Sequence, residues 1–148
     1  MNFPFEDFGL KSNNLYEILA TTYNISTQKF NLMPNTSCMG IRFTEKGDIR
    51  IYPYPTTSTF KNLKQNGLLV VNFIDNIYLY ALAALKGNDS PLKIKEFPKR
   101  KYEILKLPFP IKLKNSQKIS KISFIKGTWG LLLCKSFLEK KLVKKSSI

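Results

Sequence analysis

The densest group of side chains that could take part in chemistry is a run of four hydroxyl residues, Thr56-Thr57-Ser58-Thr59. The run comes just before a segment with the pattern of a short helix that stops at Gly67. Exposed N–H groups at the start of a helix, the hydroxyls and the nearby Lys61 would together attract a phosphate dianion. Runs of this kind also serve as plain helix caps, here with Ser58 or Thr59 as the N-cap residue. The local pattern therefore allows two interpretations, a phosphate site or a cap.

The histidine and cysteine counts remove several classes of chemistry. The 148 residues include no histidine, which excludes Ser-His-Asp and Cys-His catalysis and histidine-ligated metals. The two cysteines, Cys38 and Cys134, lie too far apart in the sequence to form a metal-ligand spacing, and no metal site is predicted. A bound organic cofactor could supply the missing reactivity, because the protein then only has to bind and orient it.

The positive charge is concentrated in the second part of the chain. The sequence has 24 Lys and Arg against 10 Asp and Glu, a net charge of +14. Residues 1–90 hold eight basic and seven acidic residues, so residues 91–148 carry a net charge of +13. Such a segment suits nucleic acid, an anionic surface or an acidic partner, because neutralised phosphates release counterions. The plainer alternative is a solvated surface, since nearly all of these cations are lysines and only Arg100 offers a guanidinium fork.

The first 90 residues are expected to form short strands and two helices. Strands are predicted at residues 15–22, 40–44, 49–54 and 68–73, the second and third of them joined as an antiparallel hairpin. One helix follows the hydroxyl run. A second helix is predicted to begin with Asp75 as its N-cap and to end at Gly87.

The pattern changes beyond Pro91. Apolar residues alternate with lysines and prolines from Leu105 to Leu113, which predicts an edge strand or an extended arm, because proline cannot donate to a strand ladder. Another short strand is predicted at 119–125. A terminal helix is predicted at 128–145, with a leucine-rich stripe and lysines near its end. The predicted organisation is one domain over residues 1–125 and a basic C-terminal helix within 126–148, packed on that domain or on a dimer partner.

Short motifs in the first 85 residues occur in an order that resembles one family of proteins. The motifs are Phe8-Gly9-Leu10, residues 16–22, Met39-Gly40-Ile41, Tyr52-Pro53-Tyr54 leading into residues 57–63, and residues 71–75 followed by 80–85. In this order they resemble a set of archaeal flavoproteins of undetermined physiological role. That set belongs to the FMN-binding split-barrel group, which also includes pyridoxamine-phosphate-oxidase-like proteins and flavin reductases.

The resemblance implies a mainly β fold, a six-stranded antiparallel split β-barrel, to which the sequence pattern adds short helices and a C-terminal helix. It further implies a homodimer with FMN in a groove at the subunit interface. Residues 39–41 would lie beneath the flavin ring, Tyr54 and Thr56 beside the ribityl chain, residues 57–62 around the phosphate, and Asn72 would reach back from the next strand. Carried over position by position, the implied cofactor-binding residues are Met39, Gly40, Ile41, Tyr54, Thr56, Thr57, Ser58, Thr59, Lys61, Asn62 and Asn72.

The leading functional hypothesis is an FMN-binding flavoprotein in which hydride passes to and from the flavin. Such transfer needs no histidine, but the lack of an obvious acid or base leaves enzyme status open and allows a storage, carrier or sensory role. The alternative is a small basic β-barrel that binds nucleic acid through residues 91–148. A third possibility is a flavin-fold protein whose role is only to bind another protein.

The expected location is the cytoplasm, with no membrane partner. No apolar run approaches the roughly 18 residues that cross a bilayer. The first residues, with Glu6 and Asp7, are acidic where a secretory signal would be basic.

Overall fold

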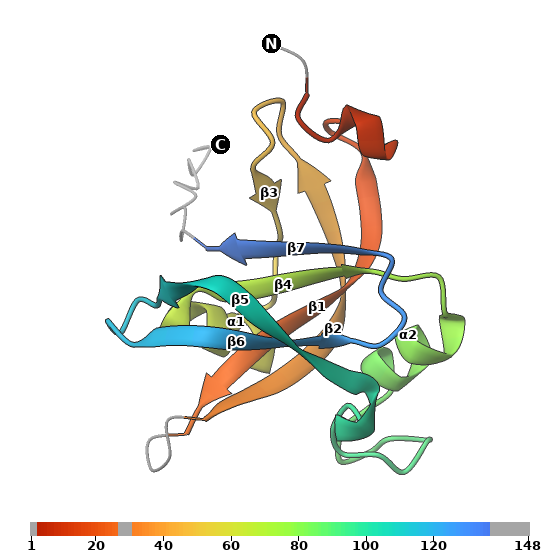
Figure 1. The fold of residues 1–148 in the computed structure, drawn as a ribbon. Coiled ribbons are helices and arrows are strands. Elements are labelled where there is room, and N and C mark those ends of the chain that lie inside the picture. The colour runs from red at the N-terminus through yellow and green to blue at the C-terminus, as the bar shows by residue number, and fades with distance from the viewer. Residues whose placement is uncertain (1–2, 27–30, 137–148) are drawn as a thin grey trace, which may run out of the picture.

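The computed structural model describes residues 3–26 and 31–136, which form a mainly β protein with few helices (Figure 1). In chain order the elements are η1 (Glu6–Phe8), β1 (Leu15–Ile25), β2 (Leu32–Phe43), β3 (Ile49–Arg50), α1 (Ser58–Asn66), β4 (Leu68–Phe73), α2 (Ile77–Ala84), η2 (Lys99–Lys101), β5 (Tyr102–Lys112), β6 (Lys118–Ile125) and β7 (Gly130–Lys135). Within the described residues, no helix is both long and apolar enough to cross a membrane.

Five strands form one antiparallel sheet in the order β3-β2-β1-β4-β7, and the sheet curls into a half-barrel (Figure 1). The long β1–β2 hairpin is paired from Leu15 opposite Arg42 to Ile25 opposite Leu32. The other edge of β2 pairs only with β3, at Arg42 and Phe43. Between residues 32 and 41, therefore, no strand of the described chain covers this edge of β2.

The strands β5 and β6 form a separate antiparallel ribbon that crosses in front of the sheet (Figure 1). Their register slips between Lys106 and Ile111, and Pro108 and Pro110 fall inside this irregular stretch. Among the described strands β5 pairs with β6 alone. The prediction of a proline-containing edge strand is thus confirmed.

The core explains why β4 is buried along its whole length. Its side chains alternate between two apolar clusters, since Leu69 and Val71 pack with Phe43, whereas Leu68 and Val70 pack beneath the β5–β6 ribbon. A third cluster lies against α2. Strand β4 therefore separates two hydrophobic layers and holds the sheet and the ribbon together.

Both helices form near their predicted positions, but each begins with a different cap residue. In α1 the N-cap is Thr57 rather than Ser58 or Thr59, and its Oγ1 accepts a hydrogen bond from the N–H of Phe60 at 3.3 Å. The predicted stop is confirmed, because Gly67 adopts a left-handed φ of 75° that glycine tolerates best.

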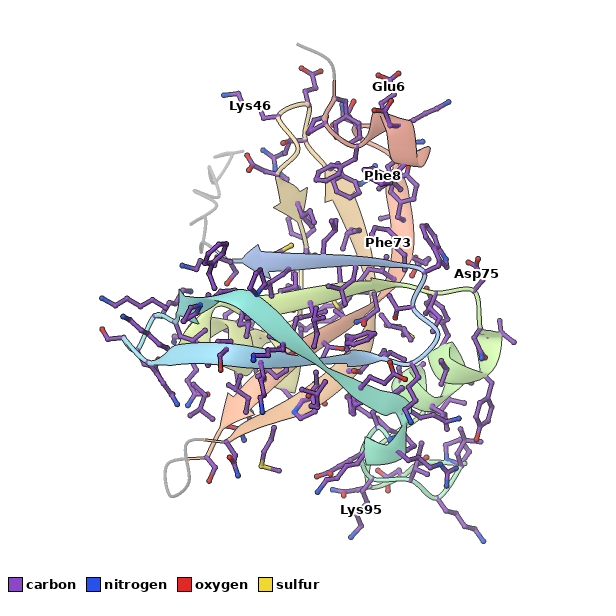
Figure 2. The ribbon with its side chains drawn as sticks, in the orientation of Figure 1. Glu6, Phe8, Lys46, Phe73, Asp75 and Lys95 are labelled. Carbon is purple, nitrogen blue, oxygen red and sulfur yellow. The ribbon has the colours of Figure 1, made fainter. Side chains whose placement is uncertain are left out.

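In α2 the N-cap is Asn76, not Asp75. The side chain of Asn76 accepts hydrogen bonds from the N–H groups of Tyr78 and Leu79, at 3.1 and 3.4 Å. Asp75 instead lies exposed in the turn before the helix (Figure 2). Asn and Asp cap helices about equally well, so the sequence alone did not separate two neighbouring candidates.

The predicted C-terminal helix at 128–145 is wrong over its described part. Residues 130–135 form β7, which pairs with β4 from Gly130 opposite Phe73 to Lys135 opposite Leu68. Residues 137–145 of that prediction lie outside the described residues. The error arises because Leu132 and Cys134 face one apolar cluster while Leu131 and Leu133 face the other, so both sides of the strand are apolar. A short apolar run of this kind has no visible period of two.

The described residues contain seven strands rather than the predicted six, divided between two sheets. The addition of β7 to the edge of β4 accounts for the extra strand. The mainly antiparallel β architecture is as predicted.

Candidate functional site

A pocket of about 250 Å³ lies where the open edge of β2 meets the start of α1. It is lined by residues of β2, of the loop after β3 and of the first turn of α1, namely Ser37, Cys38, Met39, Gly40, Tyr52, Pro53, Tyr54, Thr57 and Thr59. Five of the predicted cofactor residues are among them: Met39, Gly40, Tyr54, Thr57 and Thr59. Segments separated in the sequence are thus brought together around one cavity.

Hydroxyl groups fix the two walls of the pocket to each other. The Oγ atoms of Ser37 and Thr59 lie 3.0 Å apart, which joins β2 to α1. The Thr57 hydroxyl donates to the carbonyl of Tyr54 at 2.7 Å while it accepts from the first turn of the helix. Thr57 and Thr59 therefore have structural roles in shaping the pocket.

The start of α1 offers polar groups next to the pocket. The N–H groups of Ser58 and Thr59 belong to the first turn, where no preceding helical carbonyl is available to them. Thr56 and Ser58 are exposed, and no acidic side chain occupies the first turn. Lys61 is also exposed, one turn further along, and is not part of the lining. This end of the pocket is suited to an anion.

The neighbours of Gly40 differ from those expected for a residue beneath a flavin ring. A Cβ added to Gly40 would lie 2.9 Å from Cδ1 of Leu15 and 3.8 Å from Oε1 of Glu17. The missing side chain thus makes room first for the tip of Leu15 on the neighbouring strand. Gly40 nevertheless lines the pocket through its place on β2.

Three predicted site residues lie away from the pocket, inside the protein. Ile41 is fully buried in the core, and the amide nitrogen of Asn62 donates to Thr22 Oγ1 at 3.0 Å. Asn72 is also fully buried and donates to the carbonyl of Leu19 at 2.9 Å. Their side chains are used by the fold, and the predicted contact of Asn72 with a cofactor stays a prediction.

Cys38 lines the pocket but is not among the predicted cofactor-binding residues. Its thiol donates to the carbonyl of Tyr80 at 3.2 Å, and Lys86 donates to the carbonyl of Thr36 at 2.5 Å close by. Burial raises the pKa of the Cys38 thiol, the charge of Lys86 lowers it and the charge of Glu17 raises it further. Burial has the opposite effect on the ammonium group of Lys86 and lowers its pKa. Nothing in the sequence pattern connects residues 38, 80 and 86, which meet only through the packing of α2 on β2.

The two cysteines are expected to react at different rates. Burial raises the pKa of Cys134 to about 11, whereas the rise at Cys38 is partly offset by Lys86. Because the thiolate is the reactive form, iodoacetamide at about pH 8.5 should label Cys38 before Cys134, and both more slowly than in the urea-unfolded chain. Peptide mass spectrometry would measure this, and faster labelling of Cys134 would contradict it. The raised pKa values of both thiols also predict how stability changes with pH. Both thiols hold their protons more tightly in the folded protein than in the unfolded chain, so the free energy of unfolding should fall as the pH rises above about 8.5.

The protein is a curled antiparallel β protein with a cavity at the junction of a strand edge and a helix N-terminus. Residues 16–126 match the family described as "Protein of unknown function (DUF447) N-terminal domain". The match covers about three quarters of the chain, and the chain belongs to this family. No curated protein matches the sequence.

Proposed function

We propose that this protein binds FMN in the pocket between β2 and α1, as a split-barrel homodimer. One observation carries the proposal: β2, the loop before α1 and the first turn of α1 line the same cavity. Five of the residues that the resemblance named lie in this lining. The helix N-terminus suits the phosphate, because its unpaired N–H groups and the helix dipole both favour an anion.

The other end of the pocket suits a planar ring. Tyr54 is 78% exposed at its rim, and Met39 lies on the wall formed by β2. An exposed aromatic side chain can cover the face of an isoalloxazine ring, and a methionine side chain adapts its shape to one. Bound FMN would supply hydride-transfer chemistry, while these residues would bind and orient it and exclude water from it.

The size of the pocket supports a site shared between two copies of the chain. Its volume of about 250 Å³ falls slightly below the roughly 300 to 1,000 Å³ of usual ligand pockets. The edge of β2 beside it has no strand partner between residues 32 and 41 within the described chain. A second copy that packs here would deepen the pocket and cover the exposed edge.

The primary test is direct flavin binding. Purified protein should show absorbance bands near 370 and 450 nm or should acquire them when FMN is added, with quenched flavin fluorescence. FMN should bind more tightly than riboflavin, because only FMN has the phosphate that the start of α1 is suited to hold. Light scattering after gel filtration should give the mass of a dimer.

Cysteine labelling locates the bound flavin with an internal control. FMN should slow the labelling of Cys38, which lines the pocket, and leave the rate at Cys134 on β7 unchanged. Equal protection of both thiols would indicate global stabilisation instead of binding at this pocket. A folded protein that takes up neither FMN nor riboflavin would refute the proposal.

A further inference from the structure

The β5–β6 ribbon and its flanking segments form a surface with almost uniform positive charge. From residue 97 to residue 136 the only acidic residue is Glu103, whereas ten residues are basic. The basic residues are Lys99, Arg100, Lys101, Lys106, Lys112, Lys114, Lys118, Lys121, Lys126 and Lys135. None of them has an ion-pair partner within the described residues. No ion pair within residues 3–26 and 31–136 therefore neutralises the charge of the ribbon.

Two pairs of lysines face each other directly across the ribbon. Lys106 is opposite Lys121, and Lys112 is opposite Lys118. All four side chains are exposed. Like charges at opposed positions of two strands destabilise the pairing, so these positions are costly to the fold unless an anion lies over them. A solvated surface chosen only for solubility would place opposite charges there.

An exposed aromatic ring lies between these two pairs in the sequence. Phe109 is 78% exposed, and it stands between Pro108 and Pro110 in the irregular stretch of β5. The flanking prolines restrict the backbone of this stretch, so the segment has less conformational freedom to lose on binding. Ile104, 65% exposed on the same strand, adds apolar surface beside the lysines. The ribbon therefore offers cations and exposed apolar side chains together.

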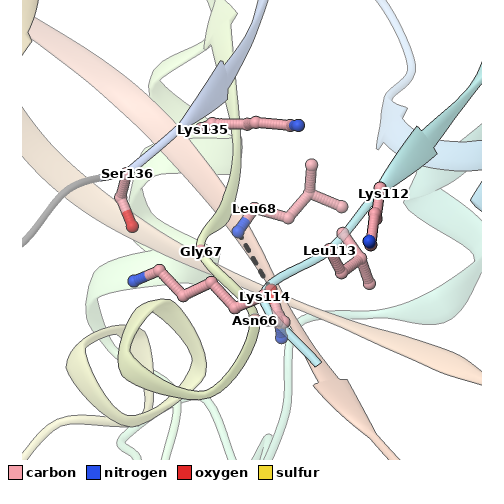
Figure 3. Close-up of a pocket in the computed structure, with 8 residues that line it drawn as sticks. All are labelled: Asn66, Gly67, Leu68, Lys112, Leu113, Lys114, Lys135 and Ser136. Atoms are coloured by element: carbon pink, nitrogen blue, oxygen red, sulfur yellow. Dashed lines mark hydrogen bonds between the residues drawn. The ribbon is translucent and has the colours of Figure 1, made fainter. Parts of the chain in front are cut away.

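A second pocket, also of about 250 Å³, opens at one end of the ribbon. Lys112 and Lys114, at and just after the end of β5, and Lys135 of β7 line it, around Gly67 and Leu68 (Figure 3). The hydroxyl of Ser136 is buried there without a hydrogen-bond partner among the described residues. The basic surface is thus hollowed at a point lined by three lysines, of which Lys114 also donates to the carbonyl of Leu63 at 3.2 Å.

We propose that the β5–β6 ribbon binds single-stranded nucleic acid, with phosphates along the lysines and a base stacked on Phe109. Lysine is a point charge that contacts phosphate without reading sequence, and aromatic stacking accepts any base, so the binding would be sequence-tolerant. A bilayer is a weaker candidate, because its flat anionic surface gives no reason for lysines to be opposed in pairs around a single ring. The ribbon shares no residue with the pocket between β2 and α1.

The test is the fluorescence anisotropy of a labelled single-stranded RNA of about 20 nucleotides and mixed sequence, from about 50 to 200 mM salt. Affinity should fall steeply with salt. The double variant Lys106→Gln/Lys121→Gln should weaken binding about tenfold and lower the salt slope by roughly 1.4, since each lost phosphate contact removes about 0.7. Phe109→Ala should weaken binding about fivefold without changing the slope. Duplex RNA should bind more weakly, because its bases are already stacked.

A matched control separates a local surface from net charge. The pair Lys11→Gln/Lys46→Gln removes the same charge from exposed positions outside the ribbon and should leave affinity within twofold. An equal loss in both double variants would overturn the proposal, as would an absence of RNA binding at about 50 mM salt. Stronger binding to phosphatidylserine vesicles than to RNA would also overturn it in favour of a membrane surface. Melting temperatures at or above the wild-type value would confirm that the ribbon variants remain folded.

Discussion

Ser58→Glu is expected to weaken FMN binding about thirtyfold while the protein becomes slightly more stable than the wild type. Ser58 is the first residue of α1, is exposed and adjoins the pocket residues Thr57 and Thr59. A carboxylate at this position would lie within a few ångströms of a phosphate bound at the helix start. Repulsion at an effective dielectric constant of about 20 costs several kcal/mol at 4 Å, so a net loss of about 2 kcal/mol is a moderate expectation.

The stability of this variant should not fall, which makes the test specific. The first turn of α1 has no acidic residue, and a carboxylate there complements the positive end of the helix dipole. A gain of roughly 0.3 to 1 kcal/mol in the free energy of unfolding is expected. Loss of FMN binding could then not be attributed to unfolding.

Two comparisons complete the Ser58→Glu experiment. Riboflavin lacks the phosphate, so its dissociation constant should change less than threefold. Gln65→Glu makes the same charge change on an exposed residue about 10 Å further along the same helix and should leave FMN binding intact. If FMN affinity is unchanged in Ser58→Glu, or falls equally in Gln65→Glu, the phosphate does not lie at the start of α1. Isothermal titration calorimetry would give all of these constants.

Asn72→Leu is expected to lower the free energy of unfolding by about 3 kcal/mol, a change of two orders of magnitude in the folding equilibrium. The Asn72 side chain is fully buried on β4. Its amide nitrogen donates to the carbonyl of Leu19 and to Thr21 Oγ1, at 2.9 and 3.1 Å. Its oxygen accepts the backbone N–H of Ile125 at 3.0 Å. One side chain thus ties β4 to β1 and to the end of β6.

Leucine has the same branched arrangement of side-chain heavy atoms as asparagine but cannot replace any of these hydrogen bonds. The N–H of Ile125 would lose its partner, and a buried polar group without a partner costs about 1 to 3 kcal/mol. The Thr21 hydroxyl would lose one of its two bonds and keep the bond to Thr36. The melting temperature should fall by roughly 10 °C, since 1 kcal/mol corresponds to about 2 to 4 °C in a chain of this size. Thermal unfolding followed by circular dichroism would measure it.

The Asn72 variant also distinguishes a structural role from the cofactor contact that the resemblance implied. A structural role predicts a lower melting temperature with FMN affinity of the folded protein changed less than threefold. Asn88→Leu, at an exposed position in the turn after α2, is the control and should change the melting temperature by less than 2 °C. Loss of FMN affinity with an unchanged melting temperature would place Asn72 at the cofactor instead.

The elements that could be predicted are those whose signals are local. The helix α1 has a hydroxyl cap at one end and Gly67 at the other, and each works through hydrogen bonds and dihedral angles of adjacent residues. The strand β5 shows its period of two at Leu107 and Ile111, which pack into the core, but Phe109 is exposed in the irregular stretch between them. The surplus of lysines beyond residue 90 is likewise a property of composition. None of these features depends on what the segment packs against.

Features that depend on partners distant in the sequence were decided by the tertiary structure. A continuous apolar run is compatible with either a helix or a strand. Residues 130–135 form a strand because they pair with the edge of β4 and pack against apolar clusters on both faces of the sheet. Asn62 and Asn72 turned into the core because buried carbonyl and hydroxyl groups of β1 required donors. The pocket itself, with Cys38 in its wall, exists only because β2 curls past the start of α1. Local interactions determined the individual helices and strands. The need to pair buried polar groups and strand edges determined how these elements pack together.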